Sequence, residues 1–364
     1  MIRQVFFDSF ICSHLISVFS LLKLMQNYSY VAIFSFLLCG FVHTAEITVK
    51  FSKDLSTTPL TYSCSLINQT YLIDDVTLRV LGSHKRGLGN ADVTIFNASH
   101  SQDDLQKFPT LIMKLFKNLN QIYLEEVNLK VLDESSFNAS ANNLETLVFG
   151  EDNIQHIDSG AFKTLINLQT LSFDYNVIDN ISDDAFIGLS NLKSLTFNGN
   201  NFTSFSSALL KPLTSLTHLS ISDNPITQLS DDTFTALTRL SILNLSNNDL
   251  RSISSSLFSS LSNLKLLDLS GNNINSIETG FLITWPSYAS LNLVENECVD
   301  KDFDQIGSEV WPLAVVEDEL EKCFVNYEDD KSLSEKTDDS VEVSSGGNDE
   351  ETGAVATNSS ESGE

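Results

Sequence analysis

Apolar and polar positions along residues 240–258 follow a spacing that is neither helical nor purely strand-like. The stretch reads LSILNLSNNDLRSISSSLF, in which a lone asparagine, Asn248, follows the apolar pair Leu243 and Leu245. A helical face needs apolar residues at i, i+3, i+4 and i+7, whereas a half-buried strand needs strict alternation. The mixed spacing therefore predicts a short strand that is followed by a turn.

This pattern recurs every 24 residues. Successive units begin at Leu144, Leu168, Leu192, Leu216, Leu240, Leu264 and Tyr288, and Leu119 precedes the first of these by 25 residues. The asparagine recurs in one register at Asn176, Asn200, Asn224, Asn248, Asn272 and Asn296. A fixed period of this length indicates a solenoid, in which stacked coils share one core.

Each unit predicts one strand and one buried turn. In Leu219-Ser220-Ile221 the apolar side chains point into the solenoid and the serine points out. The asparagine turns the chain, and its amide can bond backbone groups that the sheet leaves unpaired. We therefore expect an asparagine ladder inside the sheet and a mostly aromatic column on the far side. The column comprises Phe137, Phe162, Phe186, Phe234 and Phe258.

The repeat resembles the 24-residue extracellular class of leucine-rich repeats, with the pattern LxxLxLxxNxLxxLxxxxFxxLxx, over roughly residues 119–298. The segments TYSCSL, GLGNADV and NLVENECVDKDF are similar to a group of secreted arthropod leucine-rich repeat proteins. The resemblance implies an α/β solenoid, a leucine-rich repeat horseshoe with a concave parallel sheet, about eight repeats and a cap at each end.

The pattern divides the chain into five segments. We expect an upstream extension and signal peptide in 1–45, an amino-terminal cap in 46–118, repeats in 119–297, a carboxy-terminal cap in 298–327 and an acidic disordered tail in 328–364. The repeat weakens at its start, where Val127 and Asp152 replace the asparagine of the first two units. Weaker terminal units are expected of an array whose ends must be capped.

Two apolar runs precede the amino-terminal cap, at residues 10–24 and 30–42. The second run has the length of a signal-peptide core and ends beside small residues, so we expect translation from Met25 and cleavage near Thr44 or Ala45. The chain is then secreted. The alternative is that both runs form an uncleaved amino-terminal membrane anchor.

The cysteines also indicate whether the chain is extracellular. Cys298 and Cys323 flank a segment of the size that closes extracellular arrays of the resembling family, which implies a disulfide rather than two buried thiols. Such a bond closes a loop of about 26 residues and stabilises by roughly 3 kcal/mol. Cys64 stands alone where the resembling proteins carry a pair. An odd cysteine in a secreted chain is either a buried free thiol or an interchain link, so a covalent dimer through Cys64 stays open.

The net charge of the chain indicates which class of partner it can bind. The formal net charge is −27, and the tail alone holds twelve acidic and two basic residues. The tail has too few apolar residues to bury the surface that folding requires. It is therefore either a solubilising segment or an acidic recognition segment. Nucleic acid is not an expected partner, because its phosphates would be repelled. A basic protein is the partner that charge favours.

Sequons predict N-linked glycans on the surface of a secreted chain. They lie at Asn68, Asn97, Asn138, Asn180, Asn201, Asn244 and Asn358, apart from Asn27 inside the signal segment. Asn244 lies between Leu243 and Leu245, so we expect it to project onto the concave face. A glycan there would push binding toward an edge or an end of that face.

The sequence contains no recognisable catalytic motif. His84, His100, His156 and His218 form no metal-ligand spacing, and GSHKRGLGN lacks the order of a phosphate loop. No serine stands in GxSxG. We therefore expect neither an enzyme nor a bound cofactor.

The repeat leaves a surface exposed, and its early coils are acidic with two tyrosines. That composition is typical of a protein-binding spot, although acids can also merely keep a sheet soluble. The candidate ligand-binding residues are Tyr123, Glu125, Glu126, Glu151, Asp174, Tyr175, His218 and Asp223. The leading hypothesis is a secreted module that binds another protein, in immune or cell-surface recognition as similar repeat proteins do. A structural matrix component and a membrane-held receptor or adhesion ectodomain are the alternatives.

Overall fold

The computed structural model describes residues 31–32, 49–54, 61–66, 88–99, 111–137, 143–286 and 288–328, the first three ranges by their backbone alone. Most of the expected signal segment lies outside these ranges. The acidic tail beyond Glu328 and the sequons at Asn68 and Asn138 also lie outside them.

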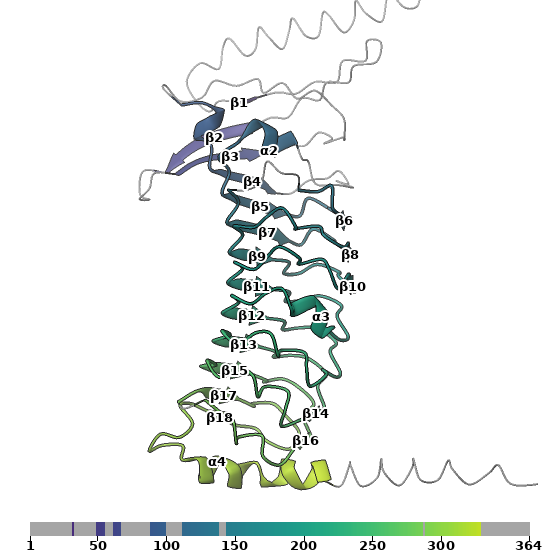
Figure 1. Cartoon of the computed structure of the whole chain (residues 1–364), viewed down its shortest axis with the longest axis vertical. Coiled ribbons are helices and arrows are strands. Elements are labelled where there is room, and N and C mark those ends of the chain that lie inside the picture. The colour runs from purple at the N-terminus through teal and green to yellow at the C-terminus, as the bar shows by residue number, and fades with distance from the viewer. Residues whose placement is uncertain are drawn as a thin grey trace, which may run out of the picture.

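One sheet runs the length of the solenoid along a single side (Figure 1). Its parallel strands are β3 (Thr61–Leu66), β4 (Ile95–Ser99), β5 (Gln121–Glu125), β7 (Thr146–Gly150), β9 (Thr170–Ser172), β11 (Ser194–Thr196), β12 (His218–Ser220), β13 (Ile242–Asn244), β15 (Leu266–Asp268) and β17 (Ser290–Asn292). The register pairs residues one repeat apart, as Leu195 with Leu219 and Leu219 with Leu243. The expected leucine-rich repeat solenoid with a parallel sheet is confirmed.

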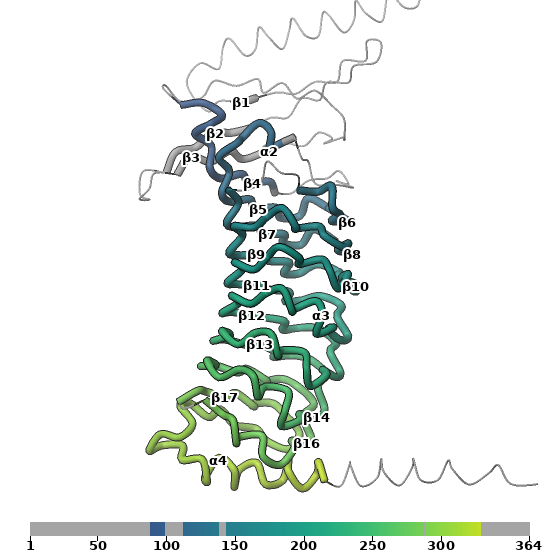
Figure 2. Tube along the Cα trace, viewed as in Figure 1, coloured from purple at the N-terminus to yellow at the C-terminus, as the bar shows by residue number. Residues whose placement is uncertain are grey.

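Each coil lies on the one before it along the trace (Figure 2), so residues one repeat apart are neighbours in space. Opposite the sheet the coils carry only short strands (Figure 1). These are β6 (Val131–Leu132), β8 (His156–Ile157), β10 (Asn180–Ile181), β14 (Ser252–Ile253) and β16 (Ser276–Ile277). Short helical segments complete the amino-terminal region and the middle coils, namely η1 (Asn90–Asp92), α2 (Leu111–Leu115) and α3 (Ser207–Leu210).

Antiparallel strands cover both ends of the sheet. β1 (Val31–Ala32) and β2 (Val49–Asp54) precede β3, while β18 (Asp302–Phe303) pairs with β17. Covered edges matter because an open edge offers unpaired backbone groups to other chains. α4 (Leu313–Glu319) and the helical residues 321–328 lie under the last coil (Figure 1).

The carboxy-terminal cap is closed by the disulfide that the sequence implied. Cys298 and Cys323 are bonded with an S–S length of 2.08 Å and a Cα–Cα distance of 5.2 Å. Both side chains are buried, at 7% and 0% exposure, in the same hydrophobic core cluster as Val316 and Leu320 of the cap. The bond therefore fastens the helical cap to the end of the array.

Two phenylalanine columns fill the interior. In the expected column, ring centroids lie 5.7 Å apart for Phe137 and Phe162 and 5.8 Å apart for Phe234 and Phe258. A second column runs along the carboxyl ends of the strands, where Phe149, Phe173 and Phe197 stack at 5.3 and 5.1 Å with planes 8° apart. Aromatic pairs of this kind contribute about 0.5 to 1.5 kcal/mol each beyond their burial.

Cys64 lies in β3, and the backbone register places Phe51 of β2 opposite it. On the other side Cys64 pairs with Phe96 of β4. Phenylalanine thus stands at both positions across the sheet from this cysteine. A disulfide to either position is excluded, and the interchain link stays a prediction.

Candidate functional site

A buried asparagine ladder fixes the end of each sheet strand. Asn176 donates from Nδ2 to the carbonyls of Phe149 and Phe173, both at 3.0 Å, and its Oδ1 accepts from the Ile154 N–H at 3.0 Å. The amides of Asn200, Asn272 and Asn296 repeat these three contacts. Asn224 donates to the carbonyls of Phe197 and Ser222, and Asn248 donates to those of Ile221, Leu245 and Ser246. Each rung ties its own coil to the preceding one.

Asp152 occupies the ladder position of the second coil. Its Oδ1 accepts from the Val127 N–H at 2.8 Å, and its own N–H donates to Asn176 Oδ1 at 3.1 Å. The side chain is 0% exposed, and Oδ2 has no hydrogen-bond partner. Burial raises the pKa of Asp152 to about 7; the Val127 N–H opposes this rise, and the charges of Glu125 and Glu126 add to it.

The residue before each ladder position adopts a left-handed backbone. We call these eight residues the turn column: Glu126, Glu151, Tyr175, Gly199, Asp223, Asn247, Gly271 and Glu295, with φ between 53° and 65°. Seven of their N–H groups donate to carbonyls of the next coil, as Tyr175 does to Asn198 at 2.7 Å and Asn247 to Ser270 at 2.8 Å, whereas the Glu295 N–H donates to Asp300 Oδ1 at 2.8 Å. Side chains of the turn column therefore project from a fixed backbone.

Four of the predicted face residues come together at the amino-terminal end of the turn column. We call Tyr123, Glu125, Glu126 and Glu151 the acidic end. The three glutamates are exposed, and they arise from the adjacent strands β5 and β7 or the turns after them. Tyr123 is half-buried, and its hydroxyl donates to Gln121 Oε1 at 3.1 Å. Tyr123 and Glu125 also line a shallow depression with Asn97 of β4.

Tyr175 continues the acidic end by one coil. Its side chain is 63% exposed, which is unusual for a large aromatic residue. The ring lies against the backbone of Gly199, where a Cβ would stand 2.6 Å from Tyr175 Cδ1. The chain thus holds an exposed aromatic ring in a supported position.

The other three predicted face residues differ in their surroundings. Asp174 is half-buried and accepts from Ser172 Oγ, Thr196 Oγ1 and the Asn198 N–H at 3.0, 2.8 and 2.8 Å. Asp223 accepts from Ser222 Oγ at 2.7 Å and Asn247 Nδ2 at 3.1 Å. His218 begins β12 at the opposite end of the strands, with Nδ1 2.8 Å from Thr217 Oγ1. His218 is therefore not part of the same spot.

The sequon asparagines within the described residues differ in access. Asn180 and Asn201 are exposed, whereas Asn97 and Asn244 are half-buried in β4 and β13. Asn244 Oδ1 accepts from the Ser246 N–H at 2.9 Å. An N-linked glycan is attached through the side-chain nitrogen, so this hydrogen bond is compatible with glycosylation. Glycosylation at all four residues stays a prediction.

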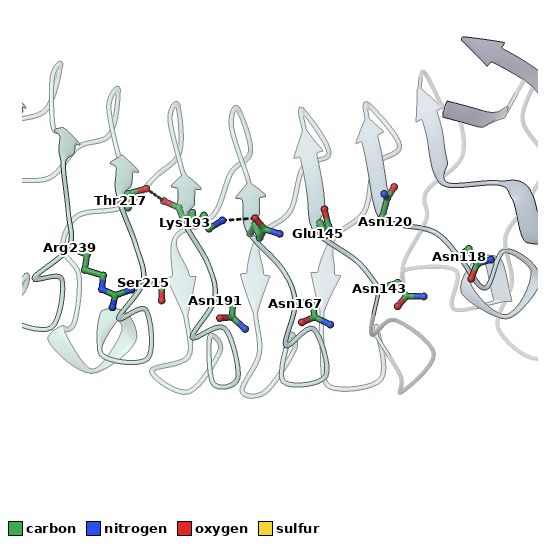
Figure 3. A pocket seen from close by; sticks show the side chains of 11 residues that line it. Asn118, Asn120, Asn143, Glu145, Asn167, Asn191, Lys193, Ser215, Thr217 and Arg239 are labelled. Carbon is green, nitrogen blue, oxygen red and sulfur yellow. Dashed lines mark hydrogen bonds between the residues drawn. The ribbon is translucent and has the colours of Figure 1, made fainter. Parts of the chain in front are cut away.

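A second row of asparagines, which the sequence interpretation missed, marks the other edge of the sheet. Asn118, Asn191 and Asn263 donate to the carbonyls of Ala91, Ile166 and Thr238 at 2.7, 2.8 and 2.7 Å. Asn118 and Asn191 of this row line an open groove of about 760 Å³, the edge groove (Figure 3). Its lining residues are Asn118, Asn120, Asn143, Glu145, Asn167, Gln169, Asn191, Lys193, Ser215, Thr217 and Arg239. The available signal was an Asn-Leu dipeptide at the start of most units.

The described residues offer little for metal chemistry or membrane insertion. Within the described ranges, no group of three or more histidine, cysteine, aspartate or glutamate side chains is arranged to hold a metal ion. None of the helices in those ranges combines the length and hydrophobicity of a bilayer span. What these residues present is an exposed polar surface.

Comparison with known proteins identifies the repeat. The leucine rich repeat family model matches overlapping stretches from residue 117 to residue 298, which is half of the 364-residue chain. No curated protein matches. The chain is similar in fold to TLR13 in its complex with ssRNA13, at 21% identity and a TM-score of 0.52, over 57% of this chain and 29% of that one.

Two further structures give lower scores. A leucine-rich repeat protein of Leptospira interrogans aligns at 23% identity and a TM-score of 0.48, over 57% of this chain and 50% of that one. Human 5T4, trophoblast glycoprotein, aligns at 23% identity and 0.45, over 55% and 76%. In the comparison with TLR13, the aligned part of this chain spans less than a third of the matched TLR13 chain. Its repeated sequence and its stacked coils together show that the chain belongs to the leucine-rich repeat family.

Proposed function

We propose that this chain is an extracellular recognition module that binds a basic protein through the acidic end. The observation that carries the proposal is the exposure of Glu125, Glu126 and Glu151 on adjacent coils, beside Tyr123. Tyr175 extends the same surface by one coil with an exposed ring. Carboxylates next to aromatic residues suit a partner rich in lysine and arginine.

The backbone of the acidic end supports this proposal. Glu126 and Glu151 hold left-handed turns whose N–H groups donate to Gly150 and Asp174 of the next coil at 2.9 and 3.2 Å. Neighbouring strands of a sheet lie about 4.8 Å apart, which sets the spacing of the carboxylates. A preorganised surface loses less conformational entropy when it binds.

The disulfide between Cys298 and Cys323 supports an extracellular setting, because disulfides persist mainly in oxidising compartments. The apolar run at 30–42 and the exposed sequons at Asn180 and Asn201 fit secretion. The resemblance of the cap segments to secreted arthropod repeat proteins favours immune or cell-surface recognition as the setting.

A charge-matched pair of variants tests the proposal. The full chain, recovered from the medium of secreting cells, is titrated with a lysine- and arginine-rich peptide as a stand-in for the partner. Glu125→Gln/Glu126→Gln/Glu151→Gln should weaken binding at least about tenfold, since each lost charge pair at an interface contributes on the order of 1 kcal/mol. The control Asp183→Asn/Asp184→Asn/Glu297→Gln removes the same charge from exposed sites elsewhere.

Retained affinity in the control supports the acidic end as the binding site. Equal losses in both variants would show that the peptide senses only the net charge of the chain. This titration, together with fractionation of the expressing cells, separates the alternatives. A saturable isotherm supports a recognition module, diffuse retention in matrix supports a structural component, and recovery solely in the membrane fraction supports an anchored ectodomain.

A further inference from the structure

The ladder changes chemistry at its amino-terminal start, where Val127 and Asp152 stand in place of asparagine and Asp152 supplies a carboxyl group. In every rung from Asn176 to Asn296 the side-chain nitrogen donates to buried carbonyls. At Asp152 an oxygen, Oδ2, takes the place of that nitrogen and has no hydrogen-bond partner. A buried polar atom that lacks a partner is costly, and such atoms are rare in folded proteins.

The repeat register identifies what Oδ2 faces. Asn176 Nδ2 donates to the carbonyls of Phe149 and Phe173. The pairing of β5 with β7 places Leu124 and Phe149 in the equivalent positions for Asp152. A carboxylate oxygen facing carbonyl oxygens is repelled, whereas a protonated carboxyl can donate its O–H to one of them. The rung is complete only when Asp152 carries a proton.

We propose that Asp152 is a proton-operated rung that regulates the acidic end, since gain of a proton completes the ladder between the first two coils and loss of the proton weakens it. The regulatory consequence rests on the proposed function, because Glu125, Glu126 and Glu151 all lie next to this rung. The stability consequence stands on the ladder alone.

The surroundings of Asp152 agree with this proposal. The charged groups around it are Glu125 and Glu126 from the preceding coil, Glu151 beside it in its own turn and Asp174 from the following coil, and all are acidic. Complete burial, opposed by the Val127 N–H, raises the pKa of the carboxyl to about 7. The proton is therefore exchanged in the neutral range.

The sign of the pH effect follows from linkage. The folded pKa lies above the unfolded value of 3.8, so between the two values the folded chain holds a proton that the unfolded chain has released. Stability from this rung is therefore fully present below about pH 3.8 and is lost progressively as the pH rises toward about 7. Above that pH the buried carboxylate exerts its full destabilising effect.

Binding at the acidic end is coupled to the same proton. A cationic partner beside Glu125 and Glu126 favours the ionised form of Asp152, so binding releases a proton near neutral pH. By reciprocity, affinity for a basic partner rises as the pH passes upward through about 7.

Thermal unfolding of the full chain between pH 5.5 and 8.5 tests the rung itself. Asp152→Asn supplies a permanent donor, so its Tm should exceed that of the wild type by several degrees at pH 8.5, and the gain should shrink toward pH 5.5. Asn176→Asp places an acid in the next rung and should lose Tm mainly at pH 8.5. A wild-type to Asp152→Asn difference that is the same at both pH values would overturn the proposal.

Calorimetry with the basic peptide tests the coupling. Titrations in buffers of different ionisation enthalpy should show net proton release at pH 7 for the wild type and none for Asp152→Asn. Equal release by both chains would contradict the coupling. A peptide that fails to bind either chain counts against the proposed function, while the unfolding experiment still decides whether Asp152 is a proton-operated rung.

Discussion

The ring of Tyr175 lies against the backbone of Gly199, one coil further along the turn column. Gly199 has a φ of 65°, and a Cβ there would stand 2.6 Å from Tyr175 Cδ1. A glycine at this position thus serves two purposes, since it adopts the left-handed turn and leaves room for the ring.

Gly199→Ala should therefore displace the Tyr175 ring and weaken binding of a basic peptide. The left-handed backbone alone makes the substitution cost about 1 kcal/mol or more of unfolding free energy. Gly271→Ala is the matched control, because a Cβ there would meet Asn247 Oδ1 at 2.2 Å and Gly271 has a φ of 64°. Both variants should lose stability in urea, and only Gly199→Ala should also lose affinity. If Gly199→Ala and Gly271→Ala bind the peptide with equal affinity, the Tyr175 ring plays no part in recognition.

The rung at Asn248 should contribute less to stability than the other asparagine rungs. In other rungs Oδ1 accepts a backbone N–H, as Asn200 does from Ile178 at 3.0 Å, but Asn248 Oδ1 has no partner. The preceding coil carries Pro225 beside Ile226, whose N–H is the equivalent donor by register. Pro225 thus coincides with the missing bond.

Asn200→Ala should for that reason cost more stability than Asn248→Ala. Each buried hydrogen bond contributes about 1 kcal/mol, and an orphaned partner adds to the loss, so we expect a difference of about 1 to 2 kcal/mol. Urea unfolding of the two variants measures it. If Asn248→Ala proves as destabilising as Asn200→Ala, the missing bond has no energetic meaning.

The carboxy-terminal cap should depend on its disulfide. Cys298→Ser/Cys323→Ser should lower the free energy of unfolding by about 3 kcal/mol, because the closed loop restricts the unfolded chain. A reductant should lower the stability of the wild type and leave the variant unchanged. Equal urea midpoints for the oxidised wild type and the variant would contradict this assignment.

Cys64 gives a prediction about assembly. Phe51 and Phe96 stand across the sheet from Cys64, so neither paired position offers a disulfide partner. Cys64 is then either a buried free thiol or an interchain link, and a dimer in non-reducing mass measurement that Cys64→Ser abolishes would establish the link. A monomeric wild type whose mass is unaffected by reductant would identify Cys64 as a free thiol.

The period and the asparagine register could be read from the sequence because each depends on one residue type at a fixed spacing. Asn176 and Asn248 are buried where that register placed them, and the cap disulfide follows the implied pairing. The turn column could not be read in the same way. Its positions hold glutamate, tyrosine, aspartate, asparagine and glycine, which share a backbone conformation rather than a chemistry.

Other features depend on contacts between coils that the repeat pattern does not report. Phe149 and Phe173 fit the pattern as apolar positions, and only their stacking makes them part of a second aromatic column. Asn191 precedes the first leucine of its coil, so it lies outside the repeat pattern, and it lines the edge groove. Asp152 was seen only as a departure from asparagine, because its environment is formed by the neighbouring coils.

Hydrogen–deuterium exchange of the full chain, with and without saturating basic peptide, tests the central claim most directly. Recognition through the acidic end predicts added protection in residues 121–126 and 146–151, with little change in the coils after residue 215. Protection centred on the edge groove near Lys193 and Arg239, or no protection in either region, would contradict the proposed binding site.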